Sequence, residues 1–223
     1  MISTSLALKL CGFLYLFILV TSAASAALGN RNDETDSASK FPTISENPGQ
    51  YRMSVNIALV SHLGILAISG MLFLAFSSYD RSLALIGSVF RIGEGLVLLY
   101  NEVSVLRLLD VAKEYALTDS NKESLRLLGD QILQTKNTRF LLGLLLLSIG
   151  ALAYSIMFVQ SGVIPSTIAW LGLAAGVISA IGILVKFASG FGTVYAIGLL
   201  SMMVFEVVFG GWLLISSPKG ITI

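Results

Sequence analysis

Residues 140–187, FLLGLLLLSIGALAYSIMFVQSGVIPSTIAWLGLAAGVISAIGILVKF, decide the fold class of this chain. They belong to two apolar runs, 139–160 and 164–187, each long enough to cross a hydrocarbon core as a helix rising about 1.5 Å per residue. Between the runs, Gly162 suits the end of one helix and Pro165 the start of the next. The short connection predicts an antiparallel pair of membrane-spanning helices that pack as neighbours.

Four more runs of this kind lie near 6–28, 53–77, 82–108 and 191–216. Of the 223 residues, 55% are hydrophobic and 12% are charged, whereas an average soluble domain has roughly 25% charged residues. We therefore expect an all-α integral membrane protein, in which a single membrane domain over 1–223 forms a bundle of six transmembrane helices. The lipid bilayer is its first partner, and the cell membrane is the expected location.

The first run has an alternative interpretation. Lys9, the apolar stretch CGFLYLFILV and the small residues TSAASAA also fit a secretory signal with its cleavage site. The run continues to Leu28, beyond the usual length of the apolar region of a signal, which favours a retained helix. A bundle of five helices is the alternative.

Two long connections differ in character. The segment 29–52 is rich in Asn, Asp, Ser, Gly and Pro, which favour turns, so we expect a loop. In 110–138, Ser120 and Glu123 match a capping box. Apolar residues then recur at helical spacing: Leu125, Leu128 and Ile132. This pattern predicts an amphipathic helix in the loop between helices three and four, either on the membrane surface or across the bundle mouth, or else a solvated connector packed on the bundle.

The third run contains a polar face within FRIGEGLVLLYNE, residues 90–102. At 100° per residue, four side chains fall within an arc of roughly 100°: Arg91, Glu94, Asn101 and Glu102. A charged residue at the bilayer centre costs about 2.5–3.5 kcal/mol on the translocon scale, so this face should point into the bundle. Arg91 and Glu94 can pair at i, i+3, whereas on its own helix Glu102 has only Arg107 as a partner.

Other helices add polar residues. Glu206, in MMVFEVVFGG of the last run, lies as deep as any charge in the chain, and we expect it to share a cavity with the polar face of the third helix. In the second helix His62 is accompanied by Asn56, and Lys186 and Tyr195 lie at the ends of the last two helices. The candidates for a ligand or ion cavity are Arg91, Glu94, Asn101, Glu102, Glu206 and His62.

These residues favour two functions. The first is a membrane protein that binds or passes a small ligand or ion through a polar cavity at helices three and six. The alternative is a structural or assembly subunit of a membrane complex, in which buried polar residues fix the helix register. The chain lacks the sequence motifs of the common hydrolases, nucleotide-binding proteins and zinc proteases, so an enzyme is disfavoured and no catalytic residue is assigned.

Metal, cofactor and nucleic acid are all disfavoured. The chain has one histidine and one cysteine, and Glu94 and Glu102 are about 12 Å apart along a helix axis, too far to share one ion. No cofactor is expected. The formal charge of +1 gives no electrostatic footprint for nucleic acid.

Small residues repeat along the fifth run: Gly172, Gly176, Ser179 and Gly182. This spacing lets helices approach closely, so it predicts an internal packing face, with a membrane protein partner or a second copy of the chain as the alternative.

Two rules oppose each other on the orientation of the chain in the membrane. The side of the membrane that carries the two termini has fewer basic residues, Lys219 among them, so the positive-inside rule places both termini outside. A signal-like first segment, in contrast, enters with its N-terminus inside.

Three stretches carry a resemblance to a known family: CGFLYLFILV, RSLALIGSVFRIGEGLV, and FLLGLLLLSIGALAYSIMFVQSGVIPSTIAWLGLAAGV. From about residue 6 to 190, the chain resembles the domain of unknown function 4386 family of prokaryotic multi-pass membrane proteins. The arginine of FRIGEG and the SGVIP turn are the most specific parts of the match. The resemblance implies an uncleaved first helix, and it brings no activity or catalytic residue.

Overall fold

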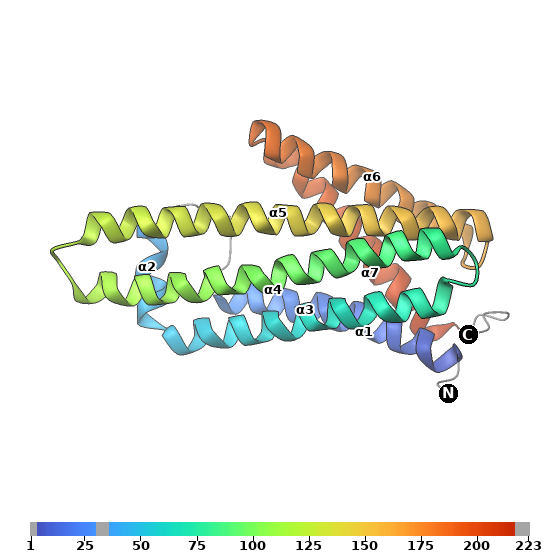
Figure 1. Cartoon of the computed structure of the whole chain (residues 1–223), viewed down its shortest axis with the longest axis horizontal. Coiled ribbons are helices and arrows are strands. Elements are labelled where there is room, and N and C mark those ends of the chain that lie inside the picture. Colours follow the sequence, from blue (N-terminus) through green and yellow to red (C-terminus); the bar gives the residue numbers. More distant parts are fainter. Residues whose placement is uncertain (1–3, 30–35, 217–223) are drawn as a thin grey trace.

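The computed structural model describes residues 4–29 and 36–216, which form seven helices and no strand (Figure 1). Their bounds are α1 Thr4–Gly29, α2 Ser37–Glu46, α3 Pro48–Phe76, α4 Arg81–Leu117, α5 Lys122–Ser161, α6 Ser166–Ser189 and α7 Gly192–Ile215. All but α2 are long and apolar enough to cross a membrane. The predicted fold class, an all-α membrane bundle, is therefore confirmed. Residues 30–35 of the expected loop 29–52, and Lys219, lie outside the described residues.

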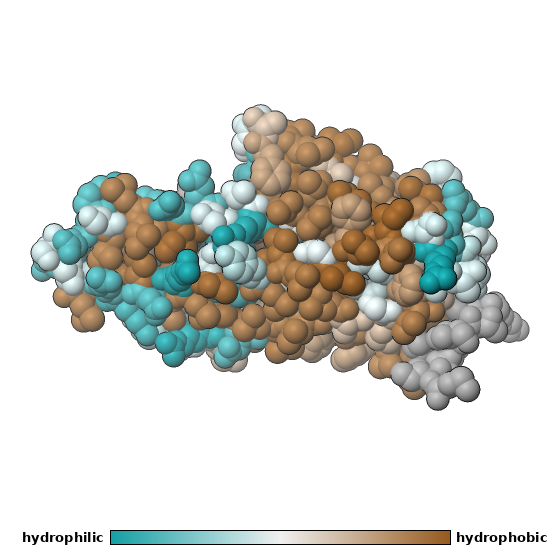
Figure 2. Space-filling view, in the orientation of Figure 1, coloured by the Kyte–Doolittle hydropathy of each residue, from teal (hydrophilic) through white to brown (hydrophobic). Residues whose placement is uncertain are grey.

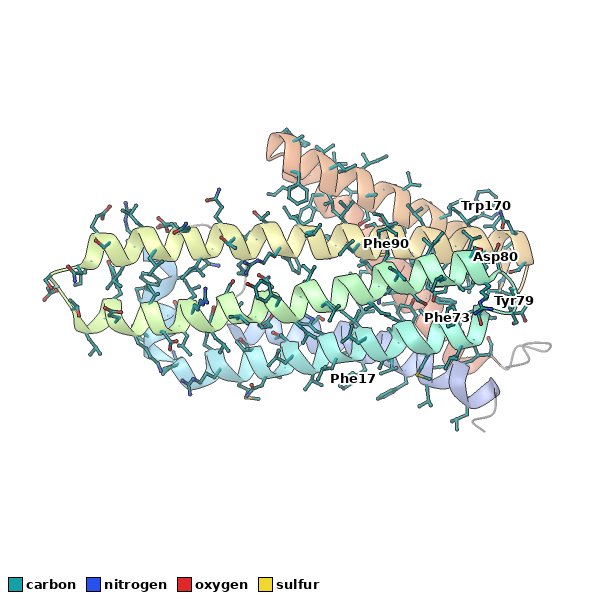
Figure 3. The ribbon with its side chains drawn as sticks, in the orientation of Figure 1. Phe17, Phe73, Tyr79, Asp80, Phe90 and Trp170 are labelled. Carbon is teal, nitrogen blue, oxygen red and sulfur yellow. The ribbon has the colours of Figure 1, made fainter. Side chains whose placement is uncertain are left out.

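The six long helices surround a common interior. Along the ring, α1 packs on α3, α3 on α4, α4 on α5, α5 on α6, α6 on α7, and α7 returns to α1. The predicted turn between the runs 139–160 and 164–187 occurs where expected, and Gly162 ends α5 with a left-handed φ of 64°. At the turn between α3 and α4, the Asp80 carboxylate caps α4 by accepting from the Leu83 amide at 2.9 Å. Figure 3 places Tyr79, Asp80 and Trp170 at the same end of the bundle.

Helix α1 is part of the bundle. A Cβ on Gly12 would lie 2.6 Å from the carbonyl oxygen of Gly210, so the backbones of α1 and α7 come into close approach there. Cys11 on the same helix is fully buried. The structure thus places the first helix within the bundle, in the position that the six-helix interpretation expects.

The small-residue face of α6 lies inside the chain. A Cβ on Gly172 would meet the ring of Phe205 at 2.5 Å, and one on Gly182 would meet the carbonyl oxygen of Val194 at 2.6 Å. Between them, the hydroxyls of Ser179 and Ser148 lie 3.0 Å apart. The face therefore packs α6 against α5 and α7.

The segment 110–138 is helical, but it is not a separate surface helix. Helix α4 continues to Leu117 and α5 begins at Lys122, so the two helices form one long hairpin (Figure 1). The expected capping box is also wrong, because Asn121 occupies the N-cap and makes no side-chain cap bond. The Lys122 ammonium lies 2.6 Å from Asp119 in the turn and holds the pKa of that carboxyl below its usual range.

Mutual packing explains the continuous hairpin. Beyond the bundle, the two helices, α2 and the first turns of α3 share a second apolar core, in which Leu108, Leu109 and Leu133 are almost completely buried. Each residue that continues a helix adds one backbone hydrogen bond. Here the apolar side chains of the added residues are also buried between the packed helices. Leu125 faces this core, whereas Leu128 is exposed.

The expected loop 29–52 contains α2, so that part of the prediction is wrong. The Asp36 carboxylate caps α2 by accepting from the Ala38 amide. The Ser37 amide donates to Asp130 Oδ1 at 2.8 Å, and the fully buried Phe41 fills the space beside Gly129 on α5. The turn-forming composition of this segment does not predict a helix, because the stability of α2 comes from docking onto the hairpin.

Two pairs of side chains indicate the level of the membrane interface on the bundle. Arg139 lies over the ring of Tyr100 at 4.5 Å, and Lys186 lies near the ring of Tyr195 at 5.8 Å, a pairing typical of the membrane interface. From Arg81 at the opposite end, α4 covers roughly 30 Å to reach Tyr100. The α4–α5 hairpin therefore projects from the membrane beyond this level, and Figure 2 shows hydrophilic residues at that end and a hydrophobic band over the middle.

Candidate functional site

A cavity of about 250 Å³ lies inside the ring, lined by residues of α1, α3, α4, α5 and α7. The structure brings all the predicted cavity residues to it: His62, Arg91, Glu94, Asn101, Glu102 and Glu206. Their exposed fractions are between 3% and 9%. The polar face of α4 therefore points inward, as the cost of a charge facing lipid requires.

Arg91 is the centre of the deep half of this cavity. Its Nη1 lies 2.8 Å from Glu94 Oε2 on the same helix and 3.6 Å from Glu206 Oε1 on α7. The guanidinium carbon lies 6.0 Å from the centre of the Tyr15 ring on α1. At about 1.5 Å per residue, Arg91 lies roughly 15 Å from Arg81, near the middle of the bilayer.

Glu102 pairs with His62, and the sequence-based choice of Arg107 is wrong. His62 Nε2 on α3 lies 3.2 Å from Glu102 Oε1, whereas Arg107 is exposed. Five residues along a helix turn the side chain by about 140°, so Arg107 points away from the face that carries Glu102.

The structure adds polar residues that the sequence did not offer as candidates. Lys136 and Asn137 of α5 line the cavity, and so do Ser22 and Ser25 of α1. The Asn101 side chain donates from Nδ2 to the backbone carbonyl of Lys136 at 3.1 Å. The expectation of a loop over 110–138 leaves Lys136 out of the helical pattern of α5. Extending the helical periodicity of α5 backwards would have found it.

Other polar residues named from the sequence lie elsewhere. Asn56 is on an exposed face of α3. Lys186 and Tyr195 contact each other between α6 and α7 and are not part of the cavity lining. Within the described residues, no cluster of His, Cys, Asp and Glu side chains is suited to hold a metal ion.

Apart from Glu94 Oε2, which is ion-paired with Arg91, three buried polar atoms of the lining lack a hydrogen-bond partner among the described residues. They are His62 Nδ1, Arg91 Nε and Asn101 Oδ1. An unsatisfied buried donor or acceptor costs about 1–3 kcal/mol, so each of these atoms favours a polar group placed inside the cavity.

The remaining walls are apolar, and one end is closed. Leu98, Phe140 and Leu144 line the cavity beside the charged residues. Between Arg91 and the α3–α4 turn, aromatic rings fill the interior: Phe158 lies 4.9 Å from Phe76 and 5.3 Å from Phe209, centre to centre. We call Phe76, Tyr154, Phe158 and Phe209 the aromatic layer, since Tyr154 stacks on Phe158 at 6.0 Å.

A second cavity, of about 200 Å³, lies under α2 at the opposite end. Its charged lining residues among those described are Lys40 and Lys136. Because Lys136 lines both cavities, they adjoin at this residue. The deep cavity therefore extends from the bilayer centre toward the side of the membrane on which α2 and the hairpin lie.

The ring of helices and its charged interior define a multi-pass helical membrane protein with a polar cavity between its helices. Residues 10–216 match the family described as Domain of unknown function (DUF4386), and the chain belongs to this family. The match confirms the family that the sequence resembles. No curated protein and no solved structure matches the chain significantly.

Proposed function

We propose that this protein binds a small molecule in the cavity between α1, α3, α4, α5 and α7. The observation that carries the proposal is the convergence of Arg91, Glu94 and Glu206 on open volume near the middle of the bilayer. Intramembrane ionisable residues that face a cavity mark binding or transport sites more often than structural ones. The unsatisfied atoms of His62 and Asn101 add groups that a ligand would engage.

The size and lining of the cavity favour a compact amphipathic ligand. An apolar cavity of about 150 Å³ holds a benzene ring, so the 250 Å³ available here suits a molecule of on the order of ten non-hydrogen atoms. Leu98, Phe140 and Leu144 would contact its apolar part, while Arg91 and the carboxylates would hold its polar group. Such a division is the usual character of small-molecule sites.

The aromatic layer favours binding over passage. Phe76, Phe158 and Phe209 close the interior beyond Arg91 with rings at van der Waals contact. A ligand can then reach the charged cluster without crossing this layer, and passage would require these rings to move. We propose the cell membrane as the location, on the basis of the six apolar helices.

The structural alternative is supported less well. Neutral links already fix neighbouring helices: Ser22 with Ser61 at 2.7 Å, Ser88 with Tyr154 at 2.6 Å, and Ser148 with Ser179 at 3.0 Å. A buried charge cluster costs more than such links and need not add stability. Helix register therefore gives no reason for Arg91 to face two carboxylates.

Mass spectrometry of protein purified gently from native membranes tests the proposal. We expect a small molecule to accompany the wild-type chain and to be depleted in Glu94→Gln and Glu102→Gln, with the yield of folded protein almost unchanged. Glu123→Gln, at the exposed hairpin tip, is the matched control and should keep the ligand. Equal loss of folded protein in both cavity variants, with no small molecule bound to the wild type, would support the structural alternative.

A further inference from the structure

The charges around Arg91 do not balance. Glu94 and Glu206 share one guanidinium, whose Nη1 lies 2.8 Å from the first carboxylate and 3.6 Å from the second. With both carboxylates ionised, the cluster carries one net negative charge. The whole lining repeats this imbalance, since Arg91 and Lys136 face Glu94, Glu102 and Glu206, with His62 the remaining titratable group.

An uncompensated charge near the middle of a bilayer is unfavourable, because neither lipid nor bulk water solvates it. The cluster therefore favours an additional positive charge at this depth. A second, independent observation indicates a hydrogen-bond donor. Asn101 Oδ1 is an acceptor without a partner among the described residues, and its side chain is 3% exposed and lines the same cavity.

The amide of Asn101 is oriented by its own hydrogen bond. Its Nδ2 donates to the carbonyl oxygen of Lys136, which can only accept, so the remaining oxygen is available to a donor. Apolar residues face the charged cluster on α4 and α5, among them Leu98, Leu144 and Leu147. A ligand that satisfies the charged cluster has a cationic N–H head and an apolar body. Asn101 lies seven residues from Glu94, about 10 Å along α4, so its Oδ1 would accept from a separate donor in the same cavity.

From this geometry we infer that the ligand is a small organic ammonium ion, bound with its charge at Glu94 and Glu206 and its apolar body against α4 and α5. This inference rests on the proposed function, since it names the chemical class of the ligand of the same cavity. A proton would supply the same charge without the apolar body. The test therefore compares ligands that share one body and differ in charge.

Three probes meet this need: 2-phenylethylammonium, 2-phenylethanol and phenylacetate. Each would be titrated at neutral pH into the full chain in lipid nanodiscs, and heats from empty nanodiscs would be subtracted to remove partitioning into lipid. We expect the ammonium probe to bind roughly tenfold or more tightly than the alcohol, since a hydrogen bond to a charged group is stronger than a neutral one, and phenylacetate to bind most weakly.

Substitutions locate the charge preference. In Glu94→Gln and in Glu206→Gln, the affinity ratio of ammonium to alcohol should fall to near one, because the cluster is then electrically balanced. Glu123→Gln removes an exposed carboxylate at the hairpin tip and should leave the ratio unchanged. The ratio compares two ligands on the same variant, so a general loss of folded protein cancels.

The outcomes separate the two proposals. If the alcohol or phenylacetate binds as tightly as the ammonium probe, the cationic ligand is ruled out while a ligand-binding cavity stands, as it would be with a proton at the cluster. If the ammonium preference survives both Glu substitutions, the assigned carboxylates are wrong. If none of the probes binds to the wild type, this inference is overturned, and the proposed function is decided separately by whether a small molecule accompanies the chain in mass spectrometry.

Discussion

Arg91 on α4 and Glu206 on α7 meet across the interior, with Nη1 of one 3.6 Å from Oε1 of the other. These helices are not neighbours in the ring, in which α4 packs on α3 and α5 while α7 packs on α6 and α1. The ion pair therefore joins two walls of the cavity that side-chain packing leaves apart. Loss of this ion pair should lower the stability of the fold and alter the arrangement of the cavity walls.

Replacing Arg91 with Met should destabilise the fold by about 3–5 kcal/mol, because two buried carboxylates lose their only described cation. Glu206→Gln should cost clearly less, since Arg91 keeps Glu94 at 2.8 Å. Unfolding of purified protein in mixed micelles with increasing SDS would measure the difference. Arg126→Met, in an exposed ion pair of the hairpin, is the control, and a cost for Arg91→Met no larger than that of the control would contradict this account.

Gly182→Ala should weaken the contact between α6 and α7. The added Cβ would lie 2.6 Å from the carbonyl oxygen of Val194 and 2.9 Å from Cα of Tyr195, and the backbone cannot move aside as a flexible side chain can. We expect a loss of about 1–3 kcal/mol in the same unfolding assay. Gly70→Ala, where nothing lies within 4 Å of the new Cβ, should instead stabilise α3 by about 0.5–1 kcal/mol. Equal effects at both positions would show that the α6–α7 contact is loose.

Thiol labelling can test whether water crosses the aromatic layer, because Cys11 is the only cysteine of the chain. Cys11 is fully buried and belongs to the same core as Phe209, so a water-soluble maleimide should not react with it in the wild type. In a Cys11→Ala background, Ser25→Cys places a thiol that is buried within the bundle at the cavity lining and should be labelled. Labelling of Cys11 at a comparable rate would mean that water crosses the aromatic layer.

Phe41→Ala should release α2 from the hairpin. The ring is fully buried, lies 4.9 Å from that of Tyr115 and fills the space beside Gly129, and truncation of such a ring costs about 3–5 kcal/mol. Hydrogen exchange followed by mass spectrometry should then show faster exchange of the α2 amides, with α6 unchanged. Ser39→Ala, at an exposed position of α2, should leave the exchange slow. Unchanged protection in Phe41→Ala would show that α2 is held by its polar contacts alone.

The features that the sequence predicted are those fixed by local chemistry. The length of an apolar run decides whether a helix can span the membrane, and the angular spacing of Arg91, Glu94 and Glu102 decides that they share a face. Both properties need no knowledge of the neighbouring helices. Placing Glu206 beside them needed a further argument, namely that a deep charge must find a partner in the interior.

The features that it missed depend on contacts between distant segments. His62 contacts Glu102 because α3 packs on α4, and the register of that packing cannot be predicted from the sequence of either helix alone. Lys136 reaches the cavity only because the hairpin keeps α5 helical to Lys122. Helix α2 likewise exists where Phe41 has a groove to occupy. In each case tertiary packing overrode local propensity.

The aromatic layer also gives the cavity a direction across the membrane. With Phe76, Phe158 and Phe209 in contact, these rings separate the charged cluster from the solution beyond the α3–α4 turn. A ligand of the proposed kind would not reach Arg91 from that solution unless the rings moved. Determining which way the chain is inserted would therefore show from which compartment the proposed ligand is excluded.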